Sequence, residues 1–278
     1  MSISVITNGS ALTALQNLNK TNDDLAMVQS RINTGLRIAN AKDNAAVWSI
    51  AQGQRADIGA LGAVKMSLDR AKSIADVAMS AGESVSDLLV QLKEKVVAAM
   101  DPSLDAASRT AMNSDYKSIL RQITQVVQNS AFDGANILDN SIPAGIKFLA
   151  NADANAFITL SSKNLTLGGA VITMAAASSI GTVTLATGVM AQVNASLVNV
   201  NQALGDIGSQ SKQLQNHATF VAKLTDVLTT GVGNLVDADL AKESAHLQAL
   251  QVQQQLGAQA LSIANQAPQV ILQLFRGG

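Results

Sequence analysis

The feature that most constrains this chain is a pair of long, helix-patterned ends, in which apolar residues recur at alternating steps of three and four. Between Ser244 and Phe275 the sequence contains no Asp, Glu, Lys or Arg, and its polar positions are mostly Gln, Asn and Ser. Spacing of this kind predicts a helix whose apolar edge packs against another helix. Because almost no charge opposes association, we expect both ends to be assembly surfaces.

Particular residues define the apolar edges of the two ends. We expect them to carry contacts between helices, because an apolar edge is stabilised by burial against a partner. They are Ala11, Leu15, Leu18, Leu25, Val28 and Ile32 in the N-terminal end, and Leu240, Leu247, Leu250, Gly257, Leu261, Ala264, Ile271 and Phe275 in the C-terminal end.

The composition argues against several classes of function. A formal net charge of −1 provides no basic field for nucleic acid. The absence of cysteine excludes disulfides and thiolate metal sites. Aromatic residues make up only 3% of the chain, which favours closely packed helices over a ring-lined pocket. The N-terminus lacks the pattern of a secretory signal, and no run of about 18 apolar residues is present, so we expect no membrane insertion.

Periodicity divides the chain into helical ends and a short β-prone middle. Helices are predicted over about 1–34, 43–100, 108–130 and 189–278. Short β-prone runs, separated by Asn, Gly and Ser, are predicted at 146–149, 157–160, 170–174 and 182–185. They predict two or three hairpins. The predicted fold class is therefore mainly α, with long antiparallel coiled-coil helices from both chain ends and a small β-hairpin-rich insert.

No set of residues in the sequence builds an active site. His217 and His246 are the only histidines, and neither stands beside a metal-binding or catalytic pattern, so each is interpreted as a helix-face residue. Asp237 and Asp239 could suggest a cation site, but helix capping and first-turn charge explain them better. We therefore predict no catalytic residue, no metal site, no cofactor and no enzymatic activity.

Three stretches are similar to known signatures. Residues 28–51 (VQSRINTGLRIANAKDNAAVWSIA) resemble the N-terminal signature of bacterial flagellins, and residues 131–138 (AFDGANIL) resemble the end of that family's N-terminal region. Residues 237–276 resemble the flagellin C-terminus, including its Asn-Gln-x-Pro-Gln element. The short middle looks most like that of small alphaproteobacterial flagellins. The chain departs from the usual Leu-Leu-Arg ending, because it has Leu274-Phe275-Arg276 followed by two glycines.

The resemblance implies a structural subunit that polymerises into the bacterial flagellar filament for swimming motility. It implies an inner coiled-coil domain of residues 1–42 plus 237–278, a helical outer-tube domain of residues 43–140 plus 189–236, and a variable surface segment of residues 141–188. It also implies secretion through the flagellum's own export channel to the extracellular filament. The implied partners are further copies of the chain, the export apparatus with an export chaperone, and the hook-associated junction and cap proteins.

The signature and the C-terminal close add residues to the apolar edges as candidate assembly positions. Taken together, the candidate assembly positions are Leu15, Leu18, Leu25, Val28, Arg31, Ile32, Leu36, Arg37, Lys42, Asp43, Leu247, Leu250, Leu261, Ile271, Leu274 and Phe275.

Three other functions are less well supported by the sequence. A hook–filament junction protein of the same family is the alternative, but it would show a degraded form of the N-terminal signature. A catalytic insert would need a motif such as His-Glu-x-x-His, and residues 141–188 contain no histidine. Membrane-surface helices usually carry Lys or Arg on their polar face, whereas the C-terminal end carries Gln.

One further segment bears on recognition by the mammalian Toll-like receptor for flagellin. Flagellins seen by this receptor carry a stretch resembling Leu-Gln-Arg-(Val/Ile)-Arg-Glu-Leu-Ala-Val-Gln, which corresponds here to residues 89–98. Lys93 keeps a positive charge and Glu94 is retained, but Gln91 replaces an arginine and Lys95 replaces a leucine. Gln cannot replace the planar guanidinium, and a buried ammonium adds a desolvation cost. We therefore expect weak or absent receptor activation.

Overall fold

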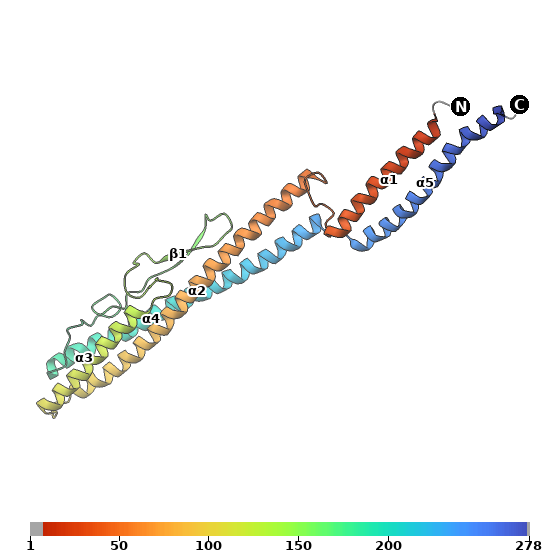
Figure 1. Ribbon diagram of the computed structural model, residues 1–278. Helices are drawn as coiled ribbons and strands as arrows, with labels where there is room; N and C mark the ends of the chain where they lie inside the picture. The colour runs from red at the N-terminus through yellow and green to blue at the C-terminus, as the bar shows by residue number, and fades with distance from the viewer. Residues whose placement is uncertain (1–7, 277–278) are drawn as a thin grey trace. The chain divides into compact units, whose positions relative to one another are not determined.

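The computed structural model describes residues 8–276, and from residue 267 onwards it describes the helix backbone without side chains. Five helices and one two-stranded sheet follow one another along this range (Figure 1). Their bounds are α1 Gly9–Thr34, α2 Ala45–Ala99, α3 Ala106–Asn129, β1 Ile146–Leu149, β2 Phe157–Leu160, α4 Val183–Val236 and α5 Leu240–Arg276. The expected fold class is confirmed.

The chain forms two compact units. One unit combines the described residues up to Ala56 with those from Val227 onwards, and the other consists of Asp57–Asp226. In the first unit α1 and α5 lie side by side and run antiparallel (Figure 1). Asn8 begins α1 by accepting a hydrogen bond from the Ala11 N–H, and Gly35 ends it with φ of +70°. Both ends of α1 therefore follow ordinary capping chemistry.

In the second unit α2 runs antiparallel to both α4 and α3. Ser86 of α2 bonds Asn201 of α4, and Lys95 of α2 pairs with Asp115 of α3. Buried positions of α2 alternate at steps of three and four, which is the spacing of a coiled-coil seam. They include Leu61, Val64, Leu68, Ala71, Ala75, Ala78, Val85, Leu89, Leu92, Val96 and Ala99, and α4 continues the pattern with Ala186, Val189, Val193, Val200, Ala203, Ile207, Leu214 and Val221.

The segment between α3 and α4 contains a single antiparallel hairpin, in which Ile146 of β1 pairs with Leu160 of β2. The expectation of two or three hairpins is therefore wrong within the described residues. Residues 170–174 form no strand, and residues 183–185 belong to α4. The reason for the second error is local. The Thr182 hydroxyl accepts a hydrogen bond from the Leu185 N–H, which starts a helix where β-branched residues favoured a strand.

Helix α4 bears on the expectation of no membrane insertion, which stays a prediction. It contains an 18-residue stretch of mean hydropathy 1.3, and by length and composition alone such a helix could cross a membrane. Only 28% of that stretch is buried within the chain. Its buried positions nevertheless follow the three-and-four spacing of the seam shared with α2. A continuous apolar run is not needed to reach this hydropathy, because Ala, Val and Leu are interleaved with uncharged polar residues.

Candidate assembly surface

The contact between α1 and α5 follows a seam with steps of three and four. Its positions on each helix are half-buried or buried, while the intervening positions are mostly exposed. Antiparallel pairing at this period is the geometry of a coiled coil. The seam consists of Ala11, Ala14, Leu18, Thr21, Leu25, Val28 and Ile32 on α1, and of Glu243, Leu247, Leu250, Gln254, Gly257, Leu261 and Ala264 on α5.

This seam is thin and partly polar. Only Val28 and Leu250 are apolar side chains with little exposure, at 2% and 5%. Thr21, Glu243 and Gln254 occupy seam positions that a strong coiled coil fills with Leu or Ile. Because hydrophobic stabilisation scales with the apolar area removed from water, the pair gains little from its own seam.

A glycine allows the two helices to approach closely near the middle of the pair. A Cβ built on Gly257 would lie 3.3 Å from Cδ1 of Leu18, which is tighter than ordinary van der Waals contact. The sequence pattern included both residues in the apolar edges. The structure adds the reason, which is that Leu18 fills the space left by the missing side chain.

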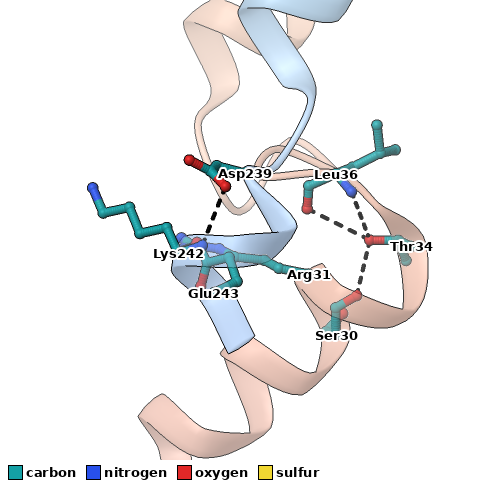
Figure 2. A network of polar contacts seen from close by, with 7 residues as sticks. All are labelled: Ser30, Arg31, Thr34, Leu36, Asp239, Lys242 and Glu243. Atoms are coloured by element: carbon teal, nitrogen blue, oxygen red, sulfur yellow. Dashed lines mark hydrogen bonds and ion pairs between the residues drawn. The ribbon is translucent and has the colours of Figure 1, made fainter. Parts of the chain in front are cut away.

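Three polar contacts fix the register of the pair. The Asn8 amide donates to the Ala264 carbonyl oxygen at 2.7 Å, and the Gln254 amide donates to Oδ1 of Asn22 at 2.7 Å. At the other end Nη1 of Arg31 pairs with Oε1 of Glu243 at 3.3 Å. Figure 2 shows these two side chains close together. Buried and partly buried polar contacts specify register more than they add stability. Oε2 of Glu243 is buried and has no hydrogen-bond partner.

Main-chain bonds join the segment after α1 to the end of α4. The Arg37 and Ile38 N–H groups both donate to the Val236 carbonyl oxygen, at 2.7 and 3.2 Å. The Ala238 N–H donates to the Gly35 carbonyl oxygen at 2.9 Å. The Thr34 hydroxyl donates to the Ser30 carbonyl oxygen and accepts from the Leu36 N–H (Figure 2). Backbone hydrogen bonds therefore hold this segment in place. The left-handed conformation of Gly35 turns the chain so that its N–H and C=O groups can make these bonds.

Side chains of the N-terminal signature hold the same segment. The Arg37 guanidinium donates to the Leu235 carbonyl oxygen at 2.9 Å. Oδ2 of Asp43 accepts from the Ala39 and Asn40 N–H groups, at 2.9 and 3.1 Å. Asp239 caps α5 by accepting from the Ala241 and Lys242 N–H groups. The capping interpretation of Asp239 is confirmed, and Arg37 and Asp43 have structural roles within one chain.

Helix α5 carries a second apolar stripe on the side away from the seam. Val252, Leu256 and Ile263 are 55%, 59% and 68% exposed. At 100° per residue these three lie within about 40° of one another around the helix and opposite the seam. We call Val252, Leu256 and Ile263 the outer stripe. Leu12, Leu15 and Met27 of α1 are also largely exposed. The paired helices therefore keep unburied apolar side chains on their outer faces.

The structure separates the predicted edge residues into two groups. Leu18, Leu25, Val28, Ile32, Leu247, Leu250 and Leu261 lie in the seam, with Arg31 beside it. Leu15 and Leu240 are 42% and 50% exposed. Leu15 lies outside the seam because Ala14 takes that step of the repeat, whereas Leu240, three positions before Glu243, keeps the spacing but is left exposed at the first residue of α5. Leu36 is half-buried and Lys42 is exposed in the connecting segment. The side chains of Ile271, Leu274 and Phe275 fall outside the described residues.

Sequence reasoning missed the small and polar members of the seam. Ala14, Thr21, Glu243 and Gln254 are not conspicuously apolar, so a search for apolar edges passed over them. They could have been found by continuing the alternating steps of three and four along each helix and accepting every position reached, whether apolar or polar. Among the described residues, no group of His, Asp and Glu side chains is arranged to hold a metal ion.

The receptor-motif positions lie on α2 in the second unit. Gln91 is exposed and lines a groove of about 550 Å³ between α2 and α3, together with Ser84, Asp87, Leu88, Gln122, Gln125, Val126 and Asn129. Lys95 does not project freely, because its ammonium pairs with Asp115 at 2.7 Å. Glu94 is exposed and Lys93 is half-buried. The groove presents amides where the receptor-activating pattern has a guanidinium.

Comparisons with known proteins agree with this arrangement. Residues 5–142 match the bacterial flagellin N-terminal helical region, and residues 190–275 match the bacterial flagellin C-terminal helical region. The chain is 55% identical to flagellin FljJ of Caulobacter vibrioides and 38% identical to a flagellin of Brucella melitensis, covering 100% and 99% of both chains respectively. The crystal structure of Bacillus cereus flagellin aligns with 56% of this chain and with 88% of the Bacillus cereus chain. The TM-score is 0.50 and the sequence identity is 16%, so this likeness supports the fold.

Proposed function

The chain belongs to the bacterial flagellin family and is a structural subunit of the extracellular flagellar filament, and we propose that α1 and α5 supply the surface through which it polymerises. Self-association follows from membership of the family. The residues that mediate it are our proposal, and so is the role of each face of the α1–α5 pair.

The observation that carries the proposal is that α5 is apolar on two opposite sides. One side is the seam against α1, and the other is the outer stripe of Val252, Leu256 and Ile263. Contiguous exposed apolar surface marks an interaction site in a protein that must remain in water. Because no charged side chain occurs between Ser244 and Phe275, no charge in this part of α5 repels a second copy. The outer stripe is therefore assigned to contacts between subunits.

The thin seam explains why polymerisation would be cooperative. Ordering a residue costs about 1–2 kcal/mol of conformational entropy, and a pair of helices with only two well-buried apolar side chains recovers little of that cost. A neighbouring subunit that covers the outer stripe supplies the missing buried area. Anything that binds only the ordered state stabilises it by mass action. Each added subunit therefore orders the α1–α5 pair of its neighbours.

We also propose the division into an inner domain of residues 1–42 plus 237–278, an outer-tube domain of residues 43–140 plus 189–236, and a surface segment of residues 141–188. The existence of two compact units supports it, although their boundary falls near Ala56 and Val227. The two flagellin regions leave residues 143–189 unmatched, which is consistent with a variable segment there.

The remaining partners are proposed from the family. The chain would be handed to the flagellar export apparatus by an export chaperone, and it would meet hook-associated junction and cap proteins at the two ends of the filament. The outer stripe of α5 supports the proposal of a chaperone, because a subunit that is not yet assembled would otherwise expose these apolar side chains to water. All members of the candidate set, including the described residues Leu36, Arg37, Lys42 and Asp43, are proposed to act in assembly or in shaping its surface.

A charge on the outer stripe tests the proposal. Leu256→Asp places a carboxylate where a dry contact between copies is proposed, which costs several kcal/mol if the site is buried in the filament. Gln253→Asp is the matched control, because it adds the same charge at an exposed position that lies beside the outer stripe and is not part of it. Purified monomers would be polymerised and examined by sedimentation and negative-stain microscopy.

The expected result is no filament from Leu256→Asp and filaments from Gln253→Asp, with equal helix content in both monomers. Polymerisation of Leu256→Asp at the wild-type critical concentration would show that the outer stripe is not an interface.

A further inference from the structure

The first turn of α1 contains the only Asn-Gly pair in the sequence, Asn8-Gly9. Asn8 is the N-cap of α1, and its side chain is held at both ends. Oδ1 accepts from the Ala11 N–H at 3.1 Å, and Nδ2 donates to the Ala264 carbonyl oxygen of α5 at 2.7 Å. One amide thus caps α1 and ties it to α5. The same amide has a chemical weakness when it is released.

An asparagine followed by glycine is open to attack from within its own backbone. The Gly9 nitrogen forms a bond to Cγ of Asn8 and loses its proton, and Nδ2 leaves as ammonia, which gives a five-membered succinimide. Water then opens the ring to aspartate or to its β-linked isomer, without any oxidant or reductant. Glycine favours this step because it has no Cβ to hinder ring closure and its backbone turns freely. Asparagine is for this reason among the thermally labile residues.

The α1–α5 pair blocks the attack. Ring closure requires the Asn8 side chain to turn toward the Gly9 nitrogen, which breaks the bonds to Ala11 and Ala264 together. A Cβ built on Gly9 would meet nothing within 4 Å, so Gly9→Ala can be made without a clash and serves as a test of the ring closure. We propose that Asn8 is a spontaneous deamidation site whose rate is set by opening of the α1–α5 pair, so that unassembled subunits are modified and assembled subunits are protected.

The product is expected to lose the pairing contact. An aspartate at position 8 still accepts from the Ala11 N–H, and its charge suits a helix N-terminus. It has no N–H group to donate, however, and it brings a carboxylate against the Ala264 carbonyl oxygen. The β-linked isomer adds a methylene to the backbone and disrupts the cap itself. Deamidation therefore removes aged monomers from the pool that assembles, a consequence that rests on the proposed function of the pair.

The rate is measured on the full-length protein by peptide mapping and mass spectrometry after incubation at neutral pH. Wild-type monomer, wild-type filament and Gly9→Ala monomer are compared. Opening of a helix pair is fast compared with succinimide formation, so the rate follows the open fraction. We expect modification in the filament and in Gly9→Ala to be slower than in the wild-type monomer by about tenfold or more. In the filament each tenfold protection corresponds to about 1.4 kcal/mol of opening free energy, whereas in Gly9→Ala the methyl group slows ring closure itself.

Equal rates in monomer and filament would overturn the role of the pair, and an unchanged rate in Gly9→Ala would overturn the succinimide route. The consequence is tested with Asn8→Asp and Asn8→Ser. Both keep a capping oxygen and remove the amide that donates to Ala264, but only aspartate adds the repulsive charge. We expect the critical concentration for polymerisation to rise in both and to rise further in Asn8→Asp. A wild-type value for Asn8→Asp would refute the consequence, whereas failure of wild-type protein to polymerise would instead count against the proposed function.

Discussion

Replacement of Leu250 by alanine tests how much of the α1–α5 pair depends on its few buried side chains. Leu250 is 5% exposed and lies in the seam, with Val28 as the other well-buried apolar residue of the pair. The change deletes three carbon atoms from the most buried part of α5. We expect it to loosen the pair and to leave the Asp57–Asp226 unit unaffected, because Leu250 contributes nothing to that unit's core.

The magnitude follows from burial and from the room available for relaxation. Leucine-to-alanine changes at buried sites cost about 2–5 kcal/mol, and the cost is lower where neighbours can close the cavity. Most seam neighbours of Leu250 are only half-buried, so we expect about 2–3 kcal/mol. That loss is large for a pair of helices with so little buried apolar surface. Protection of α1 and α5 in the monomer should therefore fall by a factor of about 30 or more.

Hydrogen exchange measured by mass spectrometry separates the two units within one sample. Leu256→Ala is the matched control, because it removes the same atoms from the same helix at a position that is 59% exposed. We expect it to change monomer protection by less than about 0.5 kcal/mol. Equal effects of Leu250→Ala and Leu256→Ala on α1 and α5, or loss of protection in α3, would refute the assignment of seam and outer stripe.

Three further outcomes are expected. Deletion of residues 250–278 should leave a soluble monomer in which α2, α3 and α4 remain protected but which forms no filament, since the removed segment holds the whole outer stripe. Filaments seen by microscopy would contradict this. Gln91→Arg together with Lys95→Leu should increase activation of the Toll-like receptor in a reporter-cell titration. Because Lys95→Leu leaves Asp115 without its partner, Lys95→Leu plus Asp115→Asn is the variant that avoids an unpaired Asp115. Full potency of the wild-type protein in the same titration would reject the prediction. An epitope inserted at Ala154, an exposed residue with φ of +54° in the β1–β2 turn, should be displayed on intact filaments. Insertion at Asn164 should reduce the filament yield, because the Asn164 side chain bonds Thr166 and the adjacent Leu165 is buried. Equal filament yields from the two insertions would contradict this distinction.

The polar seam residues suggest how filament formation and monomer solubility are balanced. Thr21, Glu243 and Gln254 weaken the pair where larger apolar residues would strengthen it. Glu243 and Gln254 also fix its register through their bonds to Arg31 and Asn22, whereas the Thr21 hydroxyl donates to the Asn17 carbonyl oxygen of its own helix. A seam of leucines would order the α1–α5 pair before assembly and would expose the outer stripe on a permanently rigid helix. The observed seam orders the pair only weakly in the monomer, and contacts between subunits complete that ordering.

The sequence by itself determined the helical ends, the position of the short insert and the flagellin resemblance. These are local properties, since the three-and-four spacing, Asp239 as a cap and Gly35 after the first helix depend only on neighbouring residues. It did not determine that the insert contains one hairpin, because residues 182–185 satisfy both a strand pattern and a helix start, and only the Thr182 cap decides between them.

Only the tertiary structure decided which face of each terminal helix meets its partner within the chain. Helix α5 is apolar on two opposite sides, so periodicity alone allowed either the seam or the outer stripe to face α1, and on α1 it allowed Leu15 or Ala14. The choice was made by contacts between residues more than 200 positions apart, namely Asn8 with Ala264 and Arg31 with Glu243. The physical reason is that a helix with two apolar faces has two similar ways to bury one of them, and the polar contacts that distinguish the two arise only when the partner helix is in place.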